Sequence, residues 1–456
     1  MQRLSEDTAL AFESSPKSSL VSRRNRSFNN AEGEELKRAV QKARSRLGPF
    51  LAVMFAISIL DRSNVGFARE ALKIDAHIDD TAFAFGAGIF FIGYSVFEIP
   101  SNLILHRVGA KVWLSRIMVT WGIASALMMF AHNEVSFYVL RFVVGVAEAG
   151  FSPGVILYST YWFPSRERGK ALGIYYMGLP AALALGSVLS GTLMQVMKGY
   201  FGLRNWQWMF LIEGLAASFV GIISFFYLAN KPRNAKWLTP AERDALEREL
   251  SSESSQRLKQ SPKTLFSALR DICVIRFMAI YFAIQVGIYG VIFYLPSRIA
   301  EITGSEINSR VGFLVSIPWL CALVSLPLIT GFADKAGKHR RFAILMLSLA
   351  TVGIALSTQT GRLEFTVLAF CISAIGFVVV QPIFWTLPTA YLSGRGAASG
   401  IAFIGAVGNL GGFVAPTLKT AIERIFHSQQ AGMLSLACTA ASGIILLASM
   451  DLCSTE

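Results

Sequence analysis

The segment RGKALGI, residues 168–174, recurs later in the chain as RGAASGI, residues 395–401. Five of the seven positions are identical, at an offset of 395 − 168 = 227 residues. A second pair, HRVGAK at 106–111 and DKAGKH at 334–339, places its glycines 337 − 109 = 228 residues apart. A nearly constant offset in two separate motifs indicates an internal repeat. The sequence therefore predicts two halves built on the same plan.

Long apolar runs fill most of both halves. The 456 residues are 53% hydrophobic and 16% charged, with a mean hydropathy of +0.50, whereas about a quarter of the residues in a typical soluble protein are charged. The runs predict an all-α polytopic membrane protein with roughly twelve spans of about 20 residues each. We place these spans at 48–68, 82–105, 112–131, 136–160, 170–194, 207–229, 273–296, 309–332, 341–358, 364–388, 396–421 and 429–450.

Polar segments divide the chain into four parts. We predict a disordered cytoplasmic tail (1–47), an N-terminal six-helix half (48–229), a cytoplasmic linker (230–272) and a C-terminal six-helix half (273–456). Two parallel six-helix repeats are typical of major-facilitator transporters, whose substrate site lies between the halves. Within the linker, LTPAERDALEREL predicts a short helix with Thr239 as N-cap, Pro240 as first residue and Glu242 as capping-box acid.

The formal net charge of +13 reflects membrane topology rather than a nucleic-acid partner. Lys and Arg gather in alternate connections, and acids such as Asp75, Asp79 and Asp80 lie in the connections between them. Under the positive-inside rule, this distribution places both termini in the cytoplasm. The sequence has no His/Cys cluster with metal-ligand spacing and no phosphate-binding loop, so we expect no metal, no cofactor and no enzymatic activity.

Two charged pairs fall inside predicted spans, where each charge costs about 2.5–3.5 kcal/mol. Asp61 and Arg62 lie roughly 20 Å along the first predicted helix, past its centre. Arg141 and Glu148 are seven residues apart, so they share one helix face, about 10 Å apart along the axis. We interpret the four residues as facing one cavity. The alternatives are a helix end in the headgroup region for the first pair and a structural charge network for the second.

The residue types in these pairs suit a carboxylate and a proton. The planar guanidinium offers two parallel donors to a carboxylate, and a buried acid can change its protonation state when its surroundings change. The C-terminal half offers polar and aromatic side chains instead, each of which taken singly is as well explained by helix packing. As candidates for the hydroxyl or ring end of a substrate we name Gln285, Tyr289, Gln381, Trp385 and Asn409, with Tyr94 from the second span.

Seven motifs in this chain resemble the anion:cation symporter family of the major facilitator superfamily. They are LDRSNVGFA, GYSVFEIPSN, RFVVGVAEAGFSPG, YWFPSRERGKALGI, NWQWMFLIEG, KWLTPAERDAL and QPIFWTLPTAYLSG with GNLGGFVAP, and they cover nearly the whole chain in family order. The resemblance implies a monomeric carrier in the bacterial inner membrane that imports a small organic anion with protons. Sugar acids such as rhamnonate, tartrate, hydroxyphenylacetate and phthalate are the substrate types it suggests.

The resemblance also implies roles for particular residues. Arg62 and Arg141 fall where the family's substrate-carboxylate arginines lie, Glu148 falls on its proton-coupling acid, and Asp61 falls on a second acid linked to coupling. An exporter or proton antiporter of a metabolite or drug on the same fold is the alternative. Two cavity arginines argue against cationic drugs.

The gating motif departs from the superfamily pattern in the first half. An Asp usually precedes the Arg after the second span, and here His106 precedes Arg107, whereas the second copy keeps Asp334 before Lys335. We therefore expect the cytoplasmic gate of the first half to close through different contacts.

Overall fold

The computed structural model describes residues 16–259, 271–359, 361–392 and 397–450, and these are nearly all helical. The N-terminal helices are α1 (Pro16–Asp75), α2 (Asp80–Val108), α3 (Ala110–Ala126), η1 (Leu127–Phe130), α4 (Glu134–Glu148), α5 (Phe151–Thr160), α6 (Ser165–Tyr176), α7 (Gly178–Val196), η2 (Tyr200–Gly202) and α8 (Asn205–Tyr227). The connection to the second half holds η3 (Pro232–Asn234) and α9 (Pro240–Lys259). The C-terminal helices are α11 (Ile272–Thr303), α12 (Ser309–Ala336), α13 (His339–Ser357), α14 (Leu363–Tyr391), α15 (Ala397–Asn409), α16 (Gly411–Phe426) and α17 (Gln429–Ala448).

Eleven helical segments within the described ranges are long and apolar enough to cross a membrane, and three of them join neighbouring helices: α3 with η1, α4 with α5, and α6 with α7. The predicted span at 396–421 corresponds to α15 and α16, which are separated at Leu410 and are each too short to be counted alone. The predicted fourth span is also divided, because α4 ends at Glu148 and Gly150 adopts the left-handed conformation (φ +84°) before α5 begins. A residue with a side chain is strained at this φ, so glycine suits the break.

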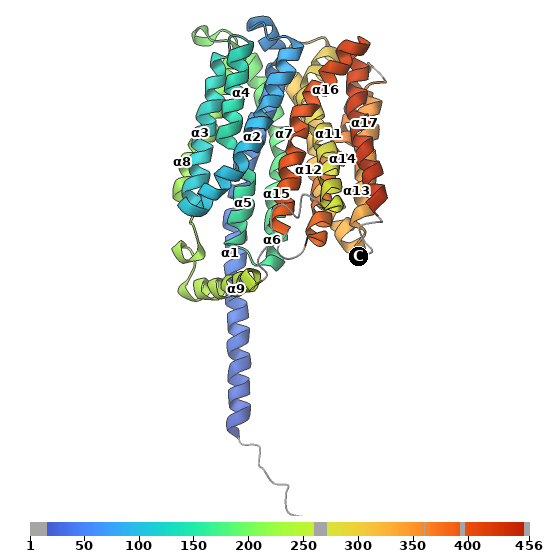
Figure 1. Cartoon of the computed structure of the whole chain (residues 1–456). Coiled ribbons are helices and arrows are strands. Elements are labelled where there is room, and N and C mark those ends of the chain that lie inside the picture. The colour runs from blue at the N-terminus through green and yellow to red at the C-terminus, as the bar shows by residue number, and fades with distance from the viewer. Residues whose placement is uncertain (1–15, 260–270, 360, 393–396, 451–456) are drawn as a thin grey trace, which may run out of the picture.

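The helices form one bundle with α9 lying across one end (Figure 1). We call this the linker end and the opposite one the far end. The helix α1 extends beyond α9 at the linker end, and α17 ends on the same side (Figure 1).

The predicted disorder of residues 1–47 is wrong for residues 16–47, because α1 begins at Pro16. Ala39, Ala43 and Leu47 are fully buried at four-residue spacing, and α1 packs against α9. Lys42 on α1 also donates to Glu242 on α9 at 2.6 Å. The average polarity of the segment obscured this apolar stripe. Residues 1–15 lie outside the described residues.

The predicted start of the linker helix is confirmed. The Thr239 backbone N–H donates to Glu242 Oε2 at 2.9 Å, and the Glu242 N–H donates to Thr239 Oγ1 at 3.3 Å, which together form a capping box. The first helical residue is Pro240.

The two halves approach each other most closely through glycines. A Cβ on Gly66 of α1 would lie 2.9 Å from the Phe293 carbonyl oxygen of α11, and one on Gly191 of α7 would lie 2.7 Å from the carbonyl oxygen of Asn308 before α12. Gly88 of α2 comes equally close to α16. Gly66 and Gly191 lie in the later parts of α1 and α7, which end at the far end, and Gly88 lies near the start of α2, which begins there (Figure 1). The backbones of the two halves therefore close the bundle on that side.

Within the first half, α3 and α8 meet at Gly122 and Gly214, and a Cβ on Gly214 would lie 2.6 Å from the Gly122 carbonyl oxygen. We expect Gly214→Val to lower the thermal stability of the purified protein, because overpacking a tight contact costs typically 1–3 kcal/mol. Thermal unfolding in detergent, followed by intrinsic fluorescence and by loss of the monodisperse peak, measures the change. Gly331→Val in α12 is the matched control, since nothing lies within 4 Å of a Cβ there. Equal stability of the two variants would contradict the prediction.

Candidate functional site

Arg62 lies in the transmembrane part of α1, is only 6% exposed, and is held by Glu148, the last residue of α4. Its Nη2 and Nε donate to Glu148 Oε1 at 2.6 and 2.9 Å. Its Nη1 donates to the Tyr289 hydroxyl of α11 at 3.0 Å. One guanidinium therefore joins an acid of its own half to the opposite half.

Aromatic rings complete the surroundings of this cation. The guanidinium carbon of Arg62 lies 4.8 Å from the ring centroid of Tyr94 and 5.3 Å from that of Phe90. The guanidinium carbon of Arg141 lies 5.0 Å from the same Phe90 ring. Cations within about 6 Å of a ring face are attracted to it. Phe90 therefore contacts both arginines and lets two like charges occupy one apolar region.

Arg141 is buried, 1% exposed, but it has no carboxylate partner among the described residues. Its Nη2 donates to the Ala87 carbonyl oxygen at 3.3 Å, while its Nε has no hydrogen-bond partner within the described ranges. The second oxygen of Glu148, Oε2, is equally without one there. Buried polar groups normally have hydrogen-bond partners. Arg141 Nε and Glu148 Oε2 therefore mark a place where a bound ligand would supply the missing hydrogen bonds.

Asp61 points away from Arg62. It accepts hydrogen bonds from the Trp121 indole N–H at 2.6 Å and the Ser125 hydroxyl at 3.1 Å, both on α3. Consecutive helical residues diverge by about 100° around the axis, because an α-helix has 3.6 residues per turn. Asp61 is thus anchored within the first half, and Glu148 rather than Asp61 holds Arg62 in place.

The prediction from sequence omitted the partners of both acids. The hydroxyl of Ser58, one turn before Arg62, donates to Glu148 Oε1 at 2.6 Å. The four-residue spacing from Ser58 to Arg62 is a signal that sequence reasoning had available. Trp121 and Ser125 carried no comparable signal, because their approach to Asp61 depends on how α3 packs.

The predicted candidates of the C-terminal half differ in how their side chains are held. Gln285 donates to the Asn409 side-chain oxygen at 3.2 Å. The amide of Gln381 faces the Phe377 carbonyl oxygen of its own helix at 3.5 Å. Trp385 packs edge-on against Tyr281, with ring centroids 4.9 Å apart. Of these contacts, the one between Tyr289 and Arg62 joins the two halves. The contacts of Gln285, Asn409, Gln381 and Trp385 given above stay within the C-terminal half.

Comparison with known proteins decides the family. A family model described as the Major Facilitator Superfamily matches residues 51–416. The chain belongs to this superfamily. It is 41% identical over 408 residues to the inner membrane transport protein RhmT of Escherichia coli (strain K12), covering 90% of this chain and 94% of that one. It is also 41% identical over 381 residues to a putative tartrate transporter of Agrobacterium vitis, covering 84% and 87%.

Solved structures confirm the major facilitator fold. The xylose transporter XylE from E. coli, in a partially occluded inward open conformation, superposes with a TM-score of 0.70 at 14% identity, covering 91% of this chain and 99% of that one. The chain is therefore a multi-pass membrane transporter of the major facilitator superfamily and not an enzyme.

The predicted gating residues of this superfamily member lie on its surface. Arg107 and Lys335 are exposed. Asp334 is also exposed, and its carboxylate lies 3.0 Å from His339 Nε2. The side chain of His106 lies outside the described part of the structure. The Asp334 contact stays within the second half, so no described contact of these residues joins the two halves.

Proposed function

We propose that this transporter imports a small hydroxylated carboxylate together with protons, by alternating access between its two halves. The observation that carries the proposal is the ion pair between Arg62 and Glu148, buried where the halves meet. A guanidinium that is already matched to one carboxylate can bind another in its place. A relative that is 41% identical is described as a putative tartrate transporter, which supports a carboxylate as the cargo.

Coupling follows from competition for Arg62. While Glu148 is ionised it occupies both Nε and Nη2 of Arg62, so a substrate carboxylate must displace it. Protonation of Glu148 removes the competing charge, and the carboxylate then binds Arg62 and the unpartnered Nε of Arg141. An anion that enters with a proton also moves less charge across the bilayer than the anion alone. Each of these steps uses residues of one chain, so we propose a monomer as the working unit.

The remaining side chains divide by their contacts. We assign recognition of substrate hydroxyls to Tyr94, Tyr289, Gln285 and Asn409. Tyr94 and Tyr289 contact Arg62 directly, and Gln285, one turn before Tyr289 on α11, donates to Asn409. Asp61 holds α3 against α1 by accepting two hydrogen bonds from α3. We propose that it affects transport through this contact.

Five further residues keep more general roles. Gln381 and Trp385 shape the wall of the C-terminal half. Arg107, Asp334 and Lys335 remain our candidates for the cytoplasmic gate. We propose that this gate forms when the carrier closes at the linker end.

We propose that the protein lies in the bacterial inner membrane with the linker end in the cytoplasm. Basic residues gather at that end, as the positive-inside rule requires. They include Lys37, Arg38, Lys42, Arg44 and Arg46 on α1. The bilayer contacts the apolar outer faces of both halves, where large hydrophobic side chains are exposed.

Uptake into proteoliposomes tests the proposed function. Reconstituted protein is given radiolabelled tartrate, gluconate, rhamnonate, hydroxyphenylacetate or phthalate, with the outside acidic, with no pH gradient, or with the gradient reversed. We expect at least one acid to accumulate above its outside concentration only when the outside is acidic, and a protonophore to abolish this accumulation. Accumulation only with the reversed gradient would show a proton antiporter instead. Absence of transport for every acid would overturn the proposal.

A further inference from the structure

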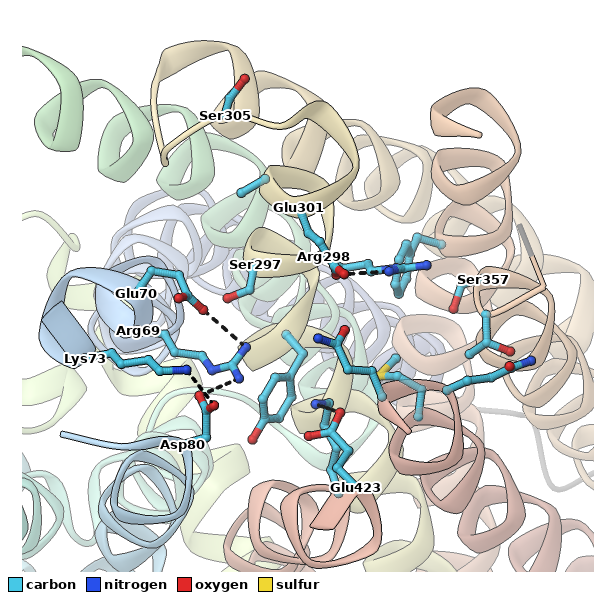
Figure 2. A pocket seen from close by; sticks show the side chains of 18 of the residues that line it. Arg69, Glu70, Lys73, Asp80, Ser297, Arg298, Glu301, Ser305, Ser357 and Glu423 are labelled. Carbon is cyan, nitrogen blue, oxygen red and sulfur yellow. Dashed lines mark hydrogen bonds and ion pairs between the residues drawn. The ribbon is translucent and has the colours of Figure 1, made fainter. Parts of the chain in front are cut away.

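A cavity of about 770 Å³ (Figure 2) is lined by Arg69, Glu70 and Lys73, which follow Gly66 on α1 toward the far end, whereas Arg62 precedes Gly66. It lies between α1 and α2 of the first half and α11, α16 and α17 of the second. We call it the outer cavity. Arg69 on its wall follows Arg62 by seven residues, which is about 10 Å along the same face of α1.

The first half gives the outer cavity two cations that share one acid. Arg69 Nη2 lies 2.7 Å from Asp80 Oδ1, and Lys73 Nζ lies 2.9 Å from Asp80 Oδ2. Figure 2 shows both side chains converging on Asp80, with Glu70 on the other side of the Arg69 guanidinium. We call the site around Arg62 the central site. It has the same arrangement, because there an acid of the protein, Glu148, forms an ion pair with the arginine.

The second half gives a third cation, and one aromatic ring joins it to the first half. The Lys419 ammonium is paired with Glu423 and lies 3.9 Å from the centroid of the Tyr294 ring. The Arg69 guanidinium of the opposite half lies 5.1 Å from the same centroid. Tyr294 on α11 therefore contacts cations from both halves, as Tyr289 on α11 contacts Arg62 further inside.

Two buried donors on the wall of the outer cavity have no acceptor in the described part of the chain, although the cavity is lined by five carboxylates and four cations. Arg69 Nε and Ser297 Oγ are buried atoms without a hydrogen-bond partner among the described residues. The hydrogen bonds of the described residues give the Lys419 ammonium, which has three N–H groups, one acceptor, Glu423. Buried donors of this kind are normally satisfied. The missing group is an acceptor that reaches Arg69 and Lys419 together, which a carboxylate with its two oxygens provides.

The rest of the wall is polar and uncharged at several points. It includes Ser305, Ser357, Thr358, Gln429 and Gln430. Hydroxyl and amide groups exchange hydrogen bonds with a polyol, whereas an aromatic acid gains little from them. The wall therefore favours a carboxylate that carries several hydroxyls.

We propose that the outer cavity is a second binding site for the transported anion, selective for a polyhydroxylated carboxylate such as a sugar acid. The inference rests on the proposed function, because it assigns the substrate class of that transport. The ligand carboxylate replaces Asp80 on Arg69 and bonds to Lys419, and its hydroxyls contact the wall that holds Gln429 and Gln430. The substrate thus binds at two successive sites, first at Arg69 and then at Arg62, and at each site the arginine is paired with an acid of the protein.

Protection of an introduced cysteine tests this site. Ser297→Cys is placed in an Arg62→Gln, Glu148→Gln background, which removes both charges of the buried pair and weakens binding at the central site. Whole cells are treated with a membrane-impermeant methanethiosulfonate, and modification of position 297 is quantified by peptide mass spectrometry. We expect gluconate to slow the modification at least threefold, while neutral sorbitol and sodium chloride at equal concentration do not. Adding Arg69→Gln or Lys419→Gln should abolish the protection.

A matched variant separates this effect from general damage. Arg298 lines the same cavity but is paired with Glu301 three residues away at 2.9 Å, so Arg298→Gln should keep the protection. Equal protection by chloride, protection that depends on Arg62, protection that survives Arg69→Gln, or no modification of Cys at 297 from outside would each overturn the inference. Failure of the wild-type protein to transport any acid, with gluconate protection intact, would remove the proposed function and leave the anion site standing.

Discussion

Replacing Arg62 with glutamine is expected to abolish accumulation of the organic acid and to weaken its binding roughly 10- to 100-fold. The variant loses charge-assisted hydrogen bonds worth about 1.5–3 kcal/mol in total, and each 1.4 kcal/mol is about a factor of ten in affinity. The central position of Arg62 explains the size of the effect, since one guanidinium contacts Glu148, Tyr289 and two aromatic rings. Uptake under an acidic outside and displacement of a radiolabelled acid from purified protein measure the two changes.

Lysine at this position should not restore transport. Its ammonium is a point donor, while Arg62 uses Nε, Nη1 and Nη2 in one plane to reach two partners in different halves. Arg116→Gln is the matched control, because Arg116 is half-buried on α3 and stacks on Trp113 away from the site. Full transport by Arg62→Lys, or equal losses in Arg62→Gln and Arg116→Gln, would contradict the role of the guanidinium.

Folding of the Arg62 variant needs its own control. Removing one partner of a buried ion pair leaves the other charge uncompensated, which costs about 3–5 kcal/mol. The double variant Arg62→Gln with Glu148→Gln removes both charges and should regain a monodisperse elution profile while remaining inactive in driven uptake. Its inactivity would then reflect the missing cation rather than a misfolded protein.

Much of the architecture follows from the sequence because the bilayer simplifies the problem. Apolar length alone predicts helices, and the 227-residue offset between RGKALGI and RGAASGI predicts two related halves. The capping box of Thr239 and Glu242 was equally accessible, since its contacts span only three residues. The part of α1 that holds Ala39, Ala43 and Leu47 was missed because these apolar residues acquire a partner only when α9 folds against them.

Pairing within the site could not be predicted in the same way. Spacing along α4 places Arg141 and Glu148 on one face, but Glu148 forms its ion pair with Arg62 of another helix. Adjacency suggested that Asp61 acts with Arg62, whereas their side chains diverge and Asp61 bonds to α3. Sequence periodicity shows which residues share a helix face. The choice of partner depends on the rotation and height of neighbouring helices, which one sequence does not encode in any local pattern.

The second large effect is expected for Glu148→Gln, which should eliminate accumulation driven by the pH gradient and retain exchange of substrate across the membrane. Glutamine keeps the shape of the side chain but cannot ionise, so it represents the protonated acid permanently. Arg62 then forms no ion pair with Glu148 and remains available to bind the substrate carboxylate. The carrier should cycle when loaded on both sides, but proton binding no longer drives its cycle.

Two assays on the same proteoliposomes separate these outcomes. Driven uptake with an acidic outside should fall to the level seen without a gradient, while counterflow of labelled against unlabelled acid should remain within about threefold of wild type, less than 0.7 kcal/mol. Glu213→Gln is the matched control, because Glu213 is a fully buried acid of the same half that bonds to Ser190 and Asn64 and makes no described contact with Arg62. It should keep driven uptake. If Glu148→Gln still accumulated substrate while Glu213→Gln did not, proton coupling would belong to the Glu213 network, and the Arg62–Glu148 pair would serve binding alone.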